Sequence, residues 1–227
     1  LAGLKQLSGK ELSYNNLLDL DAAVRIAGLI QNSGAAVIKH TNPCGAASAA
    51  TVDEALEAAM SADPTSAFGS IVAVNRVFDA AAAECLLKPG MFVEVIAAPA
   101  FTAEAVKALK TRPAWKASVR LVEVPPGDPW GPTAGLELRS VAGAMLAQRP
   151  DEAPDDPAAW RVVTEEAPAE DLTQPLDFAF TMVRRLTSNA IAVCQGTSLV
   201  GAGVGQTSRV DAVRIALEKA GDRARGS

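Results

Sequence analysis

Short apolar segments alternate with helix-like segments through the first 124 residues, and no other feature of the sequence restricts the fold as much. The apolar segments have the length of buried strands, and the segments between them have the composition of helices. Strands that alternate with helices in this way pair in parallel, so the pattern predicts an α/β fold. The expected elements are a strand at 37–40, a helix at 52–61, a strand at 71–74, a helix at 79–87, a strand at 92–97, a helix at 102–110 and a strand at 119–124.

Two proline-rich segments interrupt the second half of the chain. Residues 125–132 read Pro-Pro-Gly-Asp-Pro-Trp-Gly-Pro, which can continue neither a helix nor a strand and predicts a surface loop. A second such segment, at 149–157, is also acidic. After it we expect a helix at 176–187, strands at 190–194 and 198–202, and a helix at 208–220. The sequence therefore predicts two α/β lobes, residues 1–124 and 136–227, on either side of a loop at 125–135.

The composition narrows the possible classes of protein. A net charge of −5 argues against a broad nucleic-acid surface. No apolar run approaches the roughly 18 residues of a transmembrane helix, so we expect no membrane contact. The three cysteines are far apart, which is typical of reduced thiols in a cytoplasmic protein. The chain lacks an initiator methionine and a signal-peptide core, and we interpret it as a piece of a longer protein.

Lys39 and His40, the latter the only histidine of the chain, are the first candidates for catalysis. They end a predicted strand, and Asn42-Pro-Cys-Gly45 predicts the turn that follows it. Thr51 and Glu54 then form the pattern of a capping box at the start of a helix. We expect Lys39 and His40 on opposite sides of the pleat at the carboxyl end of the strand, where α/β sheets bind ligands. His40 can transfer a proton near neutral pH and Lys39 can stabilise an oxyanion, although a core histidine bonded to the backbone is the alternative.

The sequence Pro43-Cys-Gly-Ala-Ala47 matches half of a zinc signature that nucleobase deaminases use. The place of the second cysteine is taken by Ala47, and the chain contains no His-x-Glu sequence. A zinc site needs three or four protein ligands. We therefore expect no metal site.

Further polar residues are candidates for ligand binding. In residues 12–23 a polar pair, Asn15 and Asn16, is joined to an amphipathic helix, and Asn16 either caps that helix or contacts a ligand. Glu94 interrupts an apolar strand, where a carboxylate must be paired or used. The sequence Asp63-Pro-Thr-Ser-Ala-Phe-Gly-Ser70 suits either an ordinary turn or a planar heterocycle close to the backbone.

Alternating glycines in Gly201-Ala-Gly-Val-Gly-Gln-Thr-Ser-Arg209 lie between a predicted strand and a helix. They let a ligand approach the backbone, and a helix start offers amide donors to an anion. The spacing is not that of the dinucleotide fingerprint, so we expect a phosphate or cofactor here but not NAD. Arg209 adds a cation with fixed geometry. The alternative is an arginine that only faces solvent, which is unfavourable because a positive charge at a helix start opposes the helix dipole. Asn189 either caps the helix before it or offers an oriented amide.

Seven segments occur in one order along the chain. They are Leu-Ser-Tyr-Asn-Asn-Leu-Leu-Asp-Leu-Asp-Ala-Ala, Ile-Lys-His-Thr-Asn-Pro-Cys-Gly, Asp-Pro-Thr-Ser-Ala-Phe-Gly, Phe-Val-Glu-Val-Ile, Arg-Ser-Val-Ala-Gly, Ser-Asn-Ala-Ile and Gly-Ala-Gly-Val-Gly-Gln-Thr-Ser-Arg-Val-Asp-Ala. Together they resemble the AICAR transformylase domain of the bifunctional purine biosynthesis proteins, whose other half is IMP cyclohydrolase. The resemblance is collinear from about residue 4 to residue 220.

The resemblance implies a cytidine-deaminase-like fold of two related α/β lobes without zinc. It also implies formyl transfer from 10-formyltetrahydrofolate to AICAR, giving FAICAR and tetrahydrofolate, and a homodimer with shared active sites. In that reaction His40 takes the proton from the attacking amine, while Lys39 and Asn189 stabilise the oxyanion. The resemblance further assigns Asn16, Gly69 and Glu94 to the AICAR site and Phe68, Arg209 and Val210 to the surroundings of the folate and formyl group.

The chain departs from the family pattern at Ser70, where glycine or aspartate is usual, and at Val204, where alanine is common. Segments that hold the nucleotide phosphate and complete the folate pocket are expected outside the chain. Three other interpretations remain open. The chain can be a fragment that binds nucleotide or folate without turnover, another folate- or nucleotide-dependent transferase on the same fold, or a metal-dependent deaminase.

Overall fold

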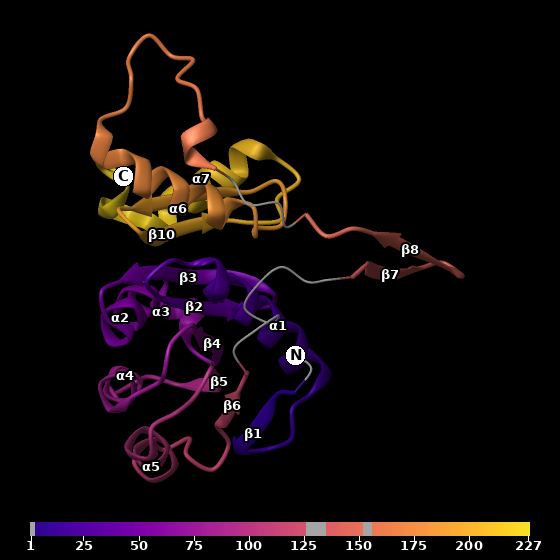
Figure 1. The fold of residues 1–227 in the computed structure, drawn as a ribbon, viewed down its shortest axis with the longest axis vertical. Helices are drawn as coiled ribbons and strands as arrows, with labels where there is room; N and C mark the ends of the chain where they lie inside the picture. The colour runs from indigo at the N-terminus through magenta and orange to yellow at the C-terminus, as the bar shows by residue number, and fades with distance from the viewer. Residues whose placement is uncertain (1–2, 126–134, 152–155) are drawn as a thin grey trace.

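The computed structural model describes residues 3–125, 135–151 and 156–227, and its central feature is one mixed eight-stranded sheet (Figure 1). The strands follow the order β1-β6-β5-β4-β2-β3-β10-β9. They are β1 (Lys5–Ser8), β2 (Ser33–Lys39), β3 (Asn42–Ala49), β4 (Ser70–Val74), β5 (Val93–Ala98), β6 (Arg120–Glu123), β9 (Ile191–Gln195) and β10 (Ser198–Gly203). A separate two-stranded ribbon consists of β7 (Glu137–Val141) and β8 (Ala144–Gln148).

Helices cover both faces of the sheet, so the α/β fold class is confirmed. They are α1 (Tyr14–Leu29), α2 (Val52–Ala62), α3 (Pro64–Ala67), α4 (Ala80–Leu86), α5 (Ala103–Thr111), α6 (Thr173–Val183) and α7 (Arg209–Ala220), with short 3₁₀ helices η2 (Pro157–Ala159), η3 (Glu170–Leu172) and η4 (Gly221–Ala224). None of the helices within the described ranges is long and apolar enough to cross a membrane.

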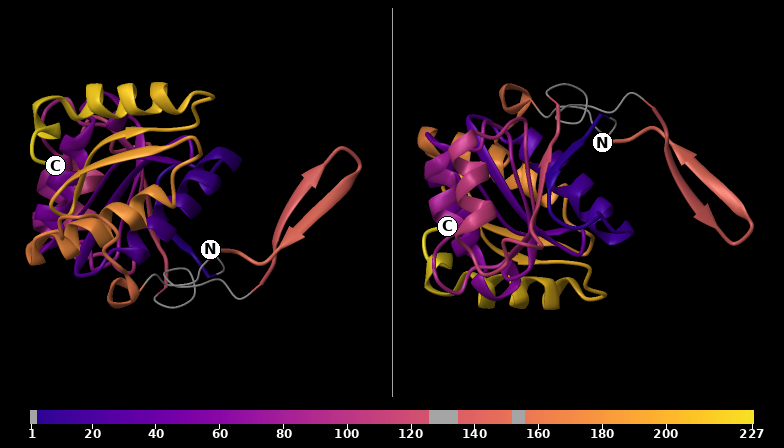
Figure 2. Two further views of the ribbon diagram at one scale, coloured as in Figure 1. Left: turned by 90° about the horizontal axis from the view of Figure 1, so that it is seen from above. Right: turned by 90° about the horizontal axis from the view of Figure 1, so that it is seen from below.

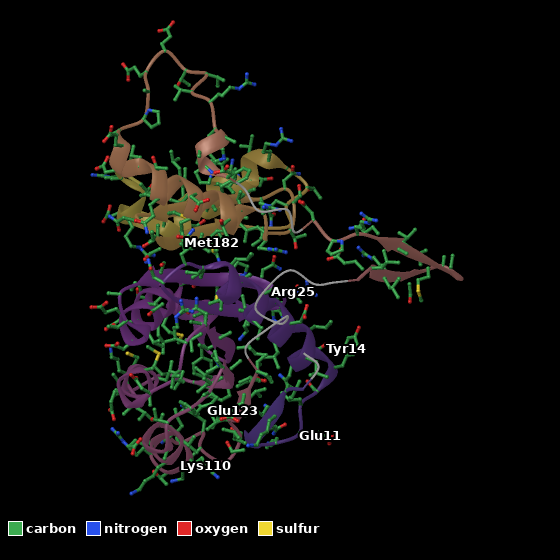
Figure 3. The ribbon with its side chains drawn as sticks, viewed as in Figure 1. Glu11, Tyr14, Arg25, Lys110, Glu123 and Met182 are labelled. Carbon is green, nitrogen blue, oxygen red and sulfur yellow. The ribbon has the colours of Figure 1, made fainter. Side chains whose placement is uncertain are left out.

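The two faces of the sheet form two separate apolar cores. Ala35 and Val37 of β2 pack with α2, α4 and α5, whereas Ala36 and Ile38 pack on the other face with α1 and α6. Met182 of α6 is fully buried and points toward the lower layers in Figure 3. Because β2 is buried on both faces, its sequence is continuously apolar, which is the signal that identified it as a strand.

The expected parallel pairing holds for β4, β5 and β6 but is wrong for β2, which runs antiparallel to β4 and to β3. The cause is β3, whose first four residues were predicted to form a turn and whose other residues were assigned to no element. β3 is built from small residues because α2 lies directly on it: a Cβ at Gly45 would lie 1.9 Å from the carbonyl oxygen of Ala59. Small residues lack the β-branched signature of a strand, so the pattern did not predict it.

Pro43 lies inside β3 without breaking the sheet. β10 pairs with β3 only at Ala46 and Ala47, so no strand among the described residues lies beside Pro43 on the outer side of β3. A proline is tolerated where its missing N–H has no partner strand. A register shift in the β2–β3 pairing, where Val37 pairs with Gly45 and Ile38 with Pro43, accommodates the extra residue.

The elements of the last third are confirmed with shifted ends. The helix predicted at 176–187 is α6, which ends at Val183, and the two predicted strands are β9 and β10. Pairing of β10 with β3 brings this third into the same sheet as the first half. The division into lobes stays a prediction; residues 126–134 of its loop, and 152–155 of the acidic segment, lie outside the described residues.

The β7–β8 ribbon projects away from the body as an arm (Figures 1 and 2). Every residue of both strands is exposed. The exposed side chains include Leu138, Met145 and Leu146. An isolated hairpin of this kind is marginally stable in water, and the exposed side chains of the arm add little packing to it.

Candidate functional site

One edge of the sheet collects all the candidate residues of the sequence analysis. Antiparallel pairing of Ile38 with Ile71 places the end of β2 beside the start of β4, and parallel pairing places the start of β5 next to it. On the other side, pairing of β3, β10 and β9 places the end of β10 and the start of β9 at the same edge. This edge is the carboxyl end of β1, β2 and β10 but the amino end of the other five strands of the sheet, β3, β4, β5, β6 and β9. The rule that ligands bind at carboxyl ends therefore does not describe this mixed sheet.

The turn between β2 and β3 consists of His40 and Thr41, and it corrects the expected position of both the turn and the histidine. Lys39 pairs with Asn42 across the hairpin. His40 has φ +52° and Thr41 has φ +64°, so both lie in the left-handed region. His40 is thus exposed at the tip of the turn rather than on the pleat opposite Lys39. A hairpin normally places Asn-Gly in such a turn, and a residue other than glycine in this conformation costs of order 1–3 kcal/mol.

Hydrogen bonds from several residues hold this unusual turn. The Asp19 carboxylate on α1 accepts from the backbone N–H of Thr41 at 2.7 Å and of His40 at 3.3 Å. Within the hairpin, the His40 carbonyl accepts from the Asn42 side-chain amide at 3.0 Å and from the Thr41 hydroxyl at 2.7 Å. These contacts satisfy backbone groups that the turn itself leaves unpaired.

Lys39 is anchored at the start of β4. Its ammonium donates to the Phe68 carbonyl at 2.5 Å and lies 3.4 Å from the Gly69 carbonyl. Gly69 has φ +71°, and a Cβ there would lie 3.3 Å from the Lys39 Nζ atom, so a larger residue would displace the cation. An ammonium has three donor hydrogens, so Lys39 keeps one for a ligand beyond these two carbonyls.

Asn16 and Glu94 meet at the same edge. Asn16 is buried in the first turn of α1, where it forms a reciprocal capping box with Ser13. Its amide also donates to Glu94 at 3.2 Å, and Arg120 lies 3.9 Å from the same carboxylate oxygen. Asn16 thus caps the helix, as one of its two alternatives predicted, and also bonds Glu94. Its contact with a ligand stays a prediction. Burying a carboxylate in an apolar strand is unfavourable. These two partners and the partial exposure of the Glu94 carboxylate offset that cost.

Asn189 and the loop after β10 complete the edge from the second half of the chain. The Asn189 amide donates to the carbonyls of Gln206 at 2.9 Å and Thr207 at 3.2 Å. Since α6 ends at Val183, Asn189 does not cap it. Thr187 links this loop to the β2–β3 hairpin, because its hydroxyl donates to the Asn42 side-chain oxygen at 3.2 Å.

Two glycines of the glycine-rich segment, which was expected to let a ligand approach the backbone, instead pack against a helix. Gly201 and Gly203 lie inside β10 and face α7: a Cβ at Gly203 would lie 1.9 Å from the Ala212 carbonyl oxygen. These two glycines therefore permit helix–strand packing rather than approach of a ligand. Only Gly205, with φ +64°, lies in the loop itself, and its N–H donates to the Thr187 carbonyl at 2.6 Å.

Three candidate residues present exposed side chains beside this edge. Phe68 is 57% exposed and packs against Phe92 with ring centroids 5.3 Å apart. Arg209 and Val210 begin α7 and are both exposed, after the N-cap Ser208. A flat aromatic face, a cation and an apolar side chain at a surface suit an extended ligand with an aromatic part.

The cysteine near the site is not a nucleophile. Burial and the nearby Asp63 carboxylate raise the pKa of the Cys44 thiol to about 12, and its sulfur donates to the Val37 carbonyl. A thiol with such a pKa is protonated at neutral pH and unreactive. No group of three or more histidine, cysteine, aspartate and glutamate side chains that could hold a metal ion occurs within the described residues.

Four residues of this edge were missed by the sequence analysis: Asp19, Asn42, Arg120 and Thr187. Asp19 follows Asn16 by three positions and so lies on the same helix face, and this spacing is the one signal that could have identified it. The others form contacts between segments far apart in sequence, and no local pattern marks them. A hollow of about 790 Å³ lies between α1 and the arm. Of the residues described above, it is lined only by Thr41, so it is not the candidate site.

The fold and this edge define an α/β protein whose site joins a cation, an exposed histidine, a buried amide–carboxylate pair and an aromatic surface. Residues 1–219 match the family described as the AICARFT/IMPCHase bienzyme, and the chain belongs to this family. Two similar relatives are bifunctional purine biosynthesis proteins PurH. That of Rhodopirellula baltica is 48% identical over 227 residues, which are 100% of this chain and 43% of the relative. That of Desulfitobacterium hafniense is 43% identical over 232 residues, which are 100% of this chain and 42% of the relative. The chain thus spans less than half the length of these relatives.

Proposed function

We propose that this chain transfers a formyl group from 10-formyltetrahydrofolate to the amino group of AICAR, giving FAICAR and tetrahydrofolate in purine biosynthesis. The observation that carries the proposal is the joint presentation of Lys39 and His40 on one hairpin beside Asn16 and Glu94. Membership of the AICARFT/IMPCHase family supplies the reaction. The name of the similar relatives, bifunctional purine biosynthesis protein, supports the same reaction.

In the proposed mechanism the residues have separate roles. The exposed His40 accepts the proton that the AICAR amine loses as it attacks the formyl carbon, and the tetrahedral oxyanion forms beside the free donor hydrogen of Lys39. Collapse of the intermediate transfers the formyl group and returns a proton to the folate nitrogen that leaves. Asn16, Gly69 and Glu94 bind AICAR, and Phe68, Arg209 and Val210 contact the folate.

Asn189 can assist the oxyanion only after a local change. Its amide donates to two backbone carbonyls in this structure, so a hydrogen must leave Gln206 or Thr207 to reach an oxyanion. Lys39 needs no such change. We therefore assign the larger share of oxyanion stabilisation to Lys39.

The test is mass-spectrometric detection of formylated AICAR after incubation of the chain with 10-formyltetrahydrofolate, alongside calorimetric binding of AICAR. We expect product from the parent, and a roughly 10²–10⁴-fold slower reaction with His40→Ala, because a positioned base contributes about that factor. Binding without product would support the alternative, a binding fragment, which is favoured by the short span of the chain relative to its relatives. If the chain neither binds AICAR nor forms the formylated product, both the transferase and the binding fragment are contradicted.

We further propose a two-lobed cytidine-deaminase-like fold, a cytoplasmic location and a homodimer with shared active sites. The three free thiols accord with a reducing compartment. The exposed apolar residues of the arm and of the outer face of α1 support a second copy as partner. Tyr14 on that face is 75% exposed and points away from the body in Figure 3. Sedimentation over a range of protein concentrations tests the dimer.

A further inference from the structure

Asp19 has no role in the mechanism above, yet its carboxylate bonds both amides of the turn that carries His40. The Oδ1 atom accepts from Thr41 and the Oδ2 atom from His40. Asp19 lies on α1, whereas the turn joins β2 to β3, so the contact comes from a separate element. It is therefore not a by-product of hairpin formation.

The turn needs such a contact because its own residues disfavour its conformation. Thr41 is β-branched and has φ +64°, which is a genuine outlier for this kind of side chain. Without an acceptor for its two amides, the pair His40-Thr41 can relax toward backbone angles that its side chains prefer. That relaxation would move the imidazole relative to Lys39, which is held separately by the Phe68 carbonyl.

α1 also connects the turn to the proposed substrate residues. Asn16 lies one helical turn before Asp19 and bonds Glu94. A single rigid helix thus fixes both the amide–carboxylate pair and the histidine turn. Geometry of this kind determines how well a base is aligned with the proton it removes.

We propose that Asp19 is a positioning residue for His40, which rests on the formyl transfer proposed above. It acts through the backbone of the turn and does not touch the reacting atoms. Removing the Asp19 carboxylate disorders the His40 imidazole but abolishes neither the fold nor the binding of AICAR.

The kinetic test uses Asp19→Ala, with Asp21→Asn as a matched control that removes a neighbouring carboxylate of α1. Asp21 bonds Arg25 on the surface and does not contact the turn. We expect Asp19→Ala to lower kcat by about ten- to hundredfold, less than His40→Ala, with KM for AICAR changed by less than about threefold. In a Thr41→Gly background, where the turn is conformationally permitted, the loss on Asp19→Ala should be several times smaller.

A second readout does not depend on turnover. His40 is the only histidine, so selective isotope labelling gives one imidazole signal. We expect a single sharp signal in the parent, a broadened or doubled one in Asp19→Ala, and a single one again in Asp19→Ala with Thr41→Gly. If Asp19→Ala fails to fold, Asp19→Asn takes its place, because one carbonyl oxygen still accepts from Thr41 and a smaller change of the same kind is expected.

These readouts separate the two proposals. A parent that makes no formylated product overturns the proposed function, and the His40 signal alone then decides the positioning role. An unchanged signal in Asp19→Ala overturns that role, as does an equal kinetic loss with and without Thr41→Gly. A rise in KM with unchanged kcat would instead make Asp19 a determinant of binding, which also contradicts the proposal.

Discussion

The two hairpins β2–β3 and β7–β8 both close with two-residue turns but differ in the residues that form them. The arm turns through Ala142 and Gly143, with glycine at the position of positive φ, +80°. The site hairpin turns through His40 and Thr41, both left-handed and neither of them glycine. Local sequence is sufficient for the first turn, whereas the second requires Asp19 from another element.

The hairpins also differ in their surroundings. β2 lies in the interior of the sheet and contributes to both apolar cores, whereas all residues of β7 and β8 are exposed. Packing therefore holds the site hairpin in place and allows it to carry an unfavourable turn. A side chain on a turn of disfavoured backbone conformation therefore depends on the tertiary structure around it.

The largest contrast is expected from truncating one apolar side chain in each hairpin. Ile38→Ala should lower the free energy of unfolding by about 2–5 kcal/mol, because Ile38 is fully buried between α1 and the sheet. Leu138→Ala in the arm should change it by less than about 0.5 kcal/mol at low protein concentration. Chemical denaturation followed by circular dichroism measures both.

Protein concentration sharpens this contrast. If a second copy covers the arm, the cost of Leu138→Ala grows with concentration while that of Ile38→Ala does not. A large cost of Leu138→Ala at every concentration would show that the arm packs on its own body, contrary to the structure.

An exchange of turn chemistry should have opposite effects in the two hairpins. Thr41→Gly removes a disfavoured residue and should raise the free energy of unfolding by about 0.5 kcal/mol, after allowance for the greater freedom of glycine in the unfolded chain. Gly143→Ala introduces a side chain at φ +80° and should destabilise the arm locally by about 1 kcal/mol.

Different measurements detect these two changes. Global unfolding reports on Thr41→Gly, whereas amide hydrogen exchange of residues 137–148 reports on Gly143→Ala, with roughly fivefold faster exchange expected. Destabilisation by Thr41→Gly would mean that the threonine hydroxyl, which bonds the His40 carbonyl, contributes more than its backbone conformation costs.

The smallest expected effect concerns pH and distinguishes the body from the arm. Burial acts to raise the pKa of Asp63, but hydrogen bonds from Lys219 and Ser66 outweigh it, so the pKa lies below the ordinary 3.8. This carboxylate therefore stabilises the fold above about pH 4, and the stabilisation is lost as the pH falls through the lowered pKa. The Asp63–Lys219 ion pair joins the end of α2 to α7, and these two helices pack on the same face of the sheet, over β3 and β10.

Asp63→Asn should reduce stability at neutral pH and flatten its decline in acid, as measured by thermal unfolding from pH 7 downward. Lys219→Met should have the same effect, because it removes the donor that lowers the pKa. An acid decline as steep as that of the parent in both variants would show that this pair does not couple stability to pH. Hydrogen exchange in the arm should be insensitive to either substitution.

Sequence reasoning predicted the buried elements well and the irregular ones poorly. The capping box at Thr51 and Glu54 and the strands and helices of the first half are confirmed, because apolar periodicity and capping residues are local signals. β3 was missed because its residues are small, which the close packing of α2 requires, and small residues are not typical of strands. The turn at His40 was misplaced by two residues because Asn-Pro is a strong local turn signal that the sheet overrides.

The sequence by itself determined the α/β class, most of the elements and, through its motifs, the candidate residues. The tertiary structure was needed to bring these residues to one edge, to make this edge the amino end of five strands, and to place Asp19 against the turn of His40. The physical reason is that helix and strand formation depends on patterns within about ten residues, whereas a site depends on contacts between segments whose approach no local pattern encodes. Asp19 and Thr41 are 22 positions apart in sequence and 2.7 Å apart at their bonded atoms.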